Sequence, residues 1–125
     1  MIANFPPVRI FSHVGRGKKT GLHMAERLFQ GDRTIDGAQV TVDGTDLDPC
    51  LGVKSYTDHG FDWSYEGDSP RQLALAILVE HLGNATDAQS LTEDFMTRVV
   101  ANFGNEWEMT SADIDTAIAN IRGTA

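Results

Sequence analysis

The sequence lacks several features that would place it in a specialised class of protein. Its 125 residues contain one cysteine, Cys50, so no disulfide can form within the chain. No apolar run reaches the roughly 18–20 residues that a membrane-spanning helix needs. The N-terminus has no basic stretch followed by an apolar one, so we expect no secretory signal. These absences predict a cytoplasmic protein.

The sequence also has little that indicates catalysis or a bound cofactor. The basic segment 15–21 lacks the first glycine of a phosphate-binding loop, and Lys19 stands where serine or threonine should hold magnesium. Asp43, Asp46 and Asp48 do not have the spacing of a calcium-binding loop. The four histidines are scattered, without the spacing of a metal site. We expect no catalytic residue, no metal and no cofactor.

Charge of both signs is present, and it is unevenly distributed. The formal net charge is −8, with +4 on residues 1–33 and −12 on residues 34–125. A basic head on an acidic body predicts two electrostatic surfaces. The simpler interpretation of the body is that acidic surfaces keep small proteins in solution.

The chain divides into a basic N-terminal arm or edge strand, residues 1–24, and a single domain, residues 25–125. In the arm, Pro6-Pro7 favours extended chain, Val8–Phe11 is compatible with a short edge strand, and the glycine-rich segment 15–21 indicates an exposed loop.

Alternating apolar residues in the domain predict three strands. The first is Ala25–Gln30, ended by Gly31-Asp32, and the second is Ala38–Val42. An irregular loop, Asp46–Asp58, follows, part of which could pair as a short strand around Leu51–Val53. The third strand is Phe61–Tyr65, with its three aromatic side chains on one face. These aromatic side chains could stack on nucleic-acid bases, but the favoured interpretation is that they pack in the core.

Three helices follow in the prediction. The first begins at Ser69-Pro70 and ends at Gly83, and the second covers Asp87–Asn102. The third begins at Thr110 or Ser111, where Thr110 and Asp113 have the spacing of a capping box, and ends at Gly123. Trp107 falls in a loop, where it either covers the core or anchors a partner. The fold class is therefore α+β: a small antiparallel sheet of about three to four strands followed by three helices packed on one face.

From about Leu28 to Ile121 the chain resembles a family of domains of unknown function from phage, plasmid and microbial genomes. The resemblance is carried by Phe29–Arg33, by Val40–Gly44 and by Gly60–Leu78, the last following the pattern GFxWxYxGxxPxQLALAIL. The family usually has glycine at the position of Ser64. The resemblance implies the α+β fold and a setting in mobile genetic elements. It implies no catalytic residues, because none is established for the family.

The leading functional hypothesis is a non-enzymatic binding protein of a phage or mobile element. Its acidic surface would contact a protein partner with a basic surface, including a host nucleic-acid-binding defence complex of the CRISPR type. The residues expected to form that surface are Asp43, Asp46, Asp48, Asp58, Asp62, Glu66 and Asp68.

Two other hypotheses stay open. In the first, the domain is a nucleic-acid-associated accessory module whose basic arm contacts phosphates, or an acidic partner, through Arg9, Arg16, Lys18 and Lys19. In the second, it is a small enzyme that uses Asp62, Glu66 or His81, and these groups would then share one pocket. Membrane binding is not expected, and the sequence leaves the oligomeric state open.

Overall fold

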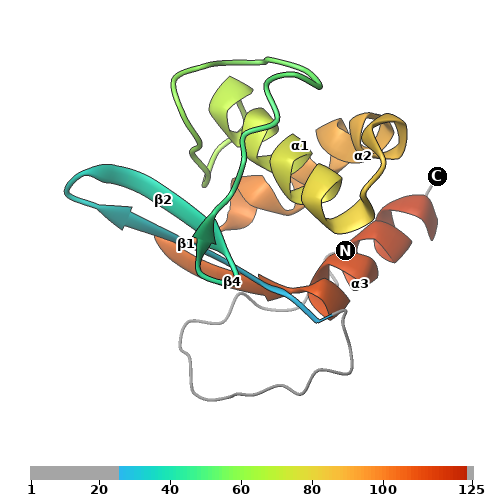
Figure 1. Ribbon diagram of the computed structural model, residues 1–125. Coiled ribbons are helices and arrows are strands. Elements are labelled where there is room, and N and C mark those ends of the chain that lie inside the picture. The colour runs from blue at the N-terminus through green and yellow to red at the C-terminus, as the bar shows by residue number, and fades with distance from the viewer. Residues whose placement is uncertain (1–25, 124–125) are drawn as a thin grey trace.

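The computed structural model describes residues 26–123 as a four-stranded antiparallel sheet in contact with three helices (Figure 1). The elements in chain order are β1 Leu28–Thr34, β2 Gly37–Val42, β3 Thr45–Asp46, α1 Asp68–Leu82, α2 Ala85–Arg98, the 3₁₀ helix η1 Val100–Asn102, β4 Glu106–Thr110 and α3 Ser111–Gly123. The predicted α+β fold class is confirmed. The predicted arm, residues 1–24, lies outside the described residues.

The sheet has the strand order β3-β2-β1-β4, with β1 paired to β2 on one side and to β4 on the other. Alternation along the strands separates an inner face from an outer face. Phe29, Val40, Val42 and Met109 are buried on the inner face. Figure 1 shows α1 and α2 side by side over the sheet, while α3 continues directly from β4.

The core is built around α1. Every residue from Gln72 to Leu78 is buried, so this helix is covered on all sides. It begins earlier than predicted, after Gly67 rather than at Ser69, and Gly83 closes it in the left-handed conformation with φ of 68°.

The start of α3 is as predicted, whereas α2 begins at Ala85 rather than at the predicted Asp87. The Asn84 side chain accepts the Asp87 amide N–H and caps α2, whose predicted C-terminal turn is instead η1. In the predicted capping box, Thr110 and Asp113 each accept the other's amide N–H, at 3.1 and 3.0 Å.

The predicted strand Phe61–Tyr65 is wrong. Ser64 has a φ of +80°, which interrupts extended backbone and favours glycine. The Ser64 amide and hydroxyl donate to the carbonyls of Val100 and Phe103, so the segment is tied to η1 and not to a strand. Consequently Trp63 is buried, whereas Tyr65 is 46% exposed and does not share its face.

Of the other strand predictions, Ala38–Val42 is confirmed by β2, whereas the rest need correction. The first strand is Leu28–Thr34 rather than Ala25–Gln30, and it continues through Gly31. Residues 51–53 form a turn and not a strand. A strand, β4, lies where a loop around Trp107 was predicted, so the sheet is completed only after two helices. Glu106–Thr110 alternates polar and apolar residues, which is the pattern of a half-buried strand, and the prediction overlooked this signal.

Candidate functional site

A long irregular segment carries most of the predicted acidic surface. We call residues 47–67, between β3 and α1, the acidic loop; it contains Asp48, Asp58, Asp62 and Glu66, and Asp46 and Asp68 flank it. Loops longer than about 12–15 residues without regular structure are uncommon in compact domains and usually have a function.

The buried side chain of Gln72 anchors the acidic loop to α1. Gln72 is 1% exposed, and its amide nitrogen donates to the carbonyls of Pro49 and Lys54 at 2.7 and 3.0 Å. Its Oε1 accepts the amide N–H groups of Tyr56 and Thr57 at 2.7 and 3.3 Å. Four bonds saturate a glutamine amide. The loop is therefore fixed to the core although it has no regular structure.

Arginines of the domain hold three of the seven predicted carboxylates. The pairs are Asp43 with Arg27, Asp62 with Arg33, and Asp68 with Arg71, with nearest N–O distances of 3.6, 2.8 and 2.7 Å. Arg71 also forms a two-bond contact with Glu93 on α2. A carboxylate held in this way contributes less to an external contact, because its charge is already partly balanced.

The contact with Arg33 also changes the pKa of the Asp62 carboxyl. Burial acts to raise the pKa of its carboxyl. The hydrogen bonds from the Arg33 guanidinium and the Trp63 amide, together with the charge of Arg33, outweigh burial and hold the pKa below its usual value. Asp62 is therefore a structural carboxylate.

The other four predicted carboxylates, Asp46, Asp48, Asp58 and Glu66, belong to exposed residues. Asp48 accepts the Cys50 amide N–H at 2.9 Å, and Asp58 lies 3.8 Å from the His59 ring, with both side chains well exposed. All four side chains are open to solvent, three of them in the acidic loop and Asp46 just before it. They are the predicted carboxylates that form no ion pair with an arginine among the described residues.

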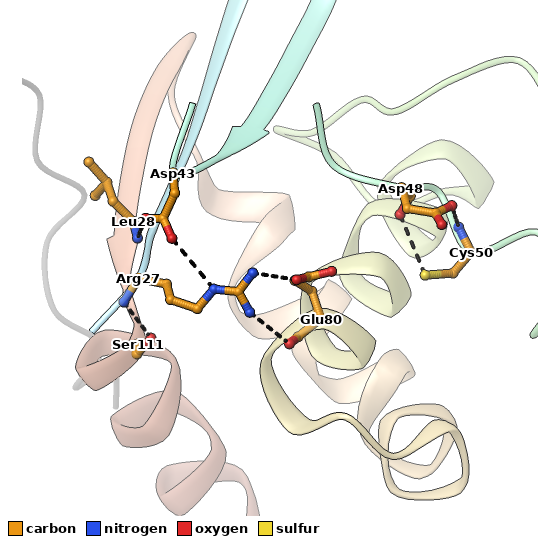
Figure 2. A network of polar contacts seen from close by, with 7 residues as sticks. All are labelled: Arg27, Leu28, Asp43, Asp48, Cys50, Glu80 and Ser111. Atoms are coloured by element: carbon orange, nitrogen blue, oxygen red, sulfur yellow. Dashed lines mark hydrogen bonds and ion pairs between the residues drawn. The ribbon is translucent and has the colours of Figure 1, made fainter. Parts of the chain in front are cut away.

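Arg27 joins three elements at one end of β1 (Figure 2). Its guanidinium contacts the Glu80 carboxylate and carbonyl on α1 and lies 3.6 Å from the Asp43 carboxylate. Its main chain exchanges hydrogen bonds with Ser111 at the start of α3. Asp43 in turn accepts the Leu28 amide N–H. We call this group the polar end.

At the other end of β1, Arg33 lies over aromatic rings. Its guanidinium is 4.7 Å from the centre of the Trp63 ring and donates to the Trp63 carbonyl at 2.6 Å. Trp63 packs edge-on against Trp107, which stacks on Phe103. The Trp107 ring covers Gly31, where a Cβ atom would lie 2.2 Å from the indole nitrogen. We call this group the aromatic end. Trp107 is 1% exposed and so covers the core.

The residues of the enzyme hypothesis do not meet in the structure. His81 lies near the C-terminal end of α1, with Nε2 2.7 Å from an Asp115 oxygen. Asp62 and Glu66 precede the helix, whose 15 residues separate its ends by roughly 20 Å. Within residues 26–123, no group of three or more metal-ligating side chains is brought together.

Two predictions remain, one about the basic N-terminal arm and one about membrane-spanning helices. Arg9, Arg16, Lys18 and Lys19 all lie outside the described residues. None of the helices between residues 26 and 123 is long and apolar enough to cross a bilayer.

Sequence reasoning missed Gln72 and Arg33. Gln72 was detectable as the polar residue that begins a wholly buried run. Arg33 carried no such signal, because its partners Asp62, Trp63 and Asn105 lie 29 to 72 residues further along the chain.

Comparison with known proteins agrees with the predicted resemblance in part. No curated protein and no solved structure matches this chain. The model of a family of unknown function, DUF6166, matches residues 29–120, which is most of the described fold from β1 through α3. The chain therefore belongs to the DUF6166 family.

Proposed function

We propose that this domain is a non-enzymatic binding protein that contacts a basic surface of a protein partner through the acidic loop and the neighbouring Asp46. The observation that carries the proposal is the anchoring of an exposed acidic segment by buried Gln72. An anchored loop loses little conformational freedom on binding, which favours affinity.

The charge of the domain supports the same proposal. All 18 acidic residues lie at Glu26 or beyond, together with six of the ten lysines and arginines. Such an excess speeds encounter with a basic surface. Proteins whose basic channels hold nucleic acid are the partner class that best fits this charge, and a host defence complex of the CRISPR type is one member. The predicted resemblance to domains of phages and plasmids is a second support for that member.

The test is affinity capture from nuclease-treated host lysate with three forms of the chain. One variant removes the four exposed charges by Asp46→Asn, Asp48→Asn, Asp58→Asn and Glu66→Gln. A matched control removes four charges elsewhere by Glu26→Gln, Asp36→Asn, Asp87→Asn and Asp94→Asn. We expect the wild type and the control to retain one partner that the loop variant loses, and added DNA to displace it. Equal retention by both variants would contradict the proposal.

A second candidate function rests on the four basic residues that precede Glu26 in an otherwise acidic chain. In this candidate the N-terminal segment contacts nucleic-acid phosphates. It predicts DNA or RNA binding that weakens steeply with salt and is lost in a Lys18→Ala/Lys19→Ala variant. Binding that the double variant retains would exclude this use of the two lysines, and no binding by the wild type would exclude the candidate.

A further inference from the structure

Strand β4 leaves one edge of the sheet open among the described residues. It is the last strand in the order β3-β2-β1-β4, and its five residues exceed the two of β3 at the opposite edge. Exposed strand edges are templates for pairing with another chain, and natural proteins usually shorten or block them. The two residues of β3 follow that rule by their small number, whereas β4 is longer and is protected only by the charges of Glu106 and Glu108, which a basic segment would neutralise.

The hydrogen bonding of β1 shows which main-chain groups of β4 face outward. The Leu28 carbonyl accepts from Asp43 on the β2 side, whereas the Arg27 carbonyl accepts from Ser111 on the β4 side. Since bonding direction alternates along an antiparallel strand, Phe29 and Gly31 bond toward β4. Their partners in register are Met109 and Trp107.

It follows that Glu106 and Glu108, the alternate residues of β4, direct their N–H and C=O groups away from β1. Among the described residues, none accepts a hydrogen bond from these main-chain groups or donates one to them. Two residues of this kind offer an added strand up to four main-chain hydrogen bonds.

The side chains beside this edge indicate which charge a strand that pairs with it should carry. Glu106 and Glu108 project to the outer face, where Asp32 lies directly opposite Glu106 in the register. Like charges at directly opposed positions destabilise a sheet unless a cation balances them. Glu108 has only a long contact, 3.4 Å, from the Gln30 amide. The edge therefore favours a segment with lysine or arginine on its outer face.

An open pocket of about 510 Å³ lies where this edge begins. Asp32, Arg33, Gly104, Asn105 and Glu106 line it. Arg33 repels a cation in the pocket only weakly, because its guanidinium already bonds Asn105 and the Asp62 carboxylate. Two of the five residues that line the pocket, Asp32 and Glu106, are acidic, which favours a long basic side chain as its occupant.

We infer that β4 is a docking edge for an extended basic segment of a partner protein, which adds as a fifth strand with alternating basic and apolar residues. A second copy of this chain fits less well, because pairing two β4 edges would bring glutamates together. The edge meets the acidic loop where Arg33 bonds Asp62. The inference deepens the proposed function and rests on it for the partner's positive charge.

The test uses the full chain and a short synthetic peptide of alternating lysine and valine. We expect binding by calorimetry, with slower amide hydrogen exchange at Glu106 and Glu108. Methylating alternate peptide nitrogens keeps the charge but blocks strand pairing, and should weaken binding at least tenfold. A Glu106→Gln/Glu108→Gln variant should also bind at least tenfold more weakly, whereas Asp36→Asn/Asp94→Asn should bind as the wild type does.

Several results would overturn the inference. No binding, or equal binding of the methylated peptide, would mean that the edge does not pair. Self-association of the chain that the Glu106 and Glu108 variant alters would assign the edge to a second copy. Stronger peptide binding after Arg9, Arg16, Lys18 and Lys19 are changed to serine would assign the edge to the chain's own N-terminal segment. The four-acid variant of the acidic loop should still bind the peptide, so failure of the edge and failure of the loop are distinguishable.

Discussion

The two ends of β1 are each fastened by an arginine, but the arginines act in different surroundings. At the polar end, Arg27 meets carboxylates whose side chains are 31% and 54% exposed. At the aromatic end, Arg33 covers the fully buried Trp63 and donates to its carbonyl and to two further side chains. Ion pairs open to water contribute little to stability, whereas cation–aromatic contacts and bonds to buried carbonyls contribute more.

We therefore expect the aromatic end to contribute more to the stability of the fold than the polar end does. The polar end should instead set the positions of α1 and α3 relative to the β2–β3 turn. Four variants test the comparison.

The largest effect is expected from Gly31→Ala at the aromatic end. The new Cβ would overlap the Trp107 indole, and the ring cannot move because Trp63 and Phe103 pack against it. We expect a loss of about 3 kcal/mol in the free energy of unfolding, measured in urea. Gly52→Ala is the matched control, since its Cβ would meet nothing within 4 Å. Equal stability of the two variants would show that the Trp107 contact is not rigid.

The next effect is expected from Arg33→Lys. Lysine keeps the charge but cannot stack on Trp63 while bonding Asn105, Asp62 and the Trp63 carbonyl together. We expect a loss of about 2 kcal/mol in the free energy of unfolding and a change in tryptophan fluorescence. A variant as stable as the wild type would mean that charge alone matters at this end.

A smaller loss, about 1 kcal/mol, is expected from Arg27→Gln, because its partners are partly exposed. Salt should separate the two ends, since about 1 M salt screens exposed pairs strongly. The Arg27→Gln loss should shrink at high salt, whereas the Arg33→Lys loss should persist. The control is Arg122→Gln at an exposed position, with an expected change within about 0.5 kcal/mol. A salt-independent Arg27→Gln loss would make the two ends alike.

The smallest effect is the dependence of stability on acid pH through Asp62. Its folded-state pKa lies below the unfolded value of about 3.9, so its contribution is present above that pH and is lost as pH falls through the folded pKa. Asp62→Asn should therefore be less stable than the wild type near neutral pH and should lose less stability below about pH 4. Urea unfolding at several pH values measures both. Parallel curves would show that the Arg33 contact does not hold the charged carboxylate.

Prediction from the sequence was most successful where a few neighbouring residues decide the structure. Gly83 ends α1, and Thr110 with Asp113 begins α3, because each forms bonds within a few residues of itself. The family resemblance was predicted from the segments around Phe29, Val40 and Gly60, and the family match confirms a domain of unknown function over residues 29–120.

Prediction failed where distant partners decide the structure. The alternation in Phe61–Tyr65 indicates a strand, but Ser64 bonds to Val100 and Phe103 instead. Glu106–Thr110 has the alternation of a strand, which the prediction overlooked, but only pairing with the distant strand β1 decides its place in the sheet. For the same reason the sequence identified the acids without showing which of them the arginines hold.

The sequence by itself therefore determined the α+β class, the C-terminal end of α1, the start of α3 and the excess of negative charge, because these depend on composition and on contacts between near neighbours. Only the tertiary structure decided how the two ends of β1 are fastened, which carboxylates stay exposed, and that β4 forms an open edge. Those features depend on residues far apart in the chain, and only the packing of sheet against helices brings them within bonding distance.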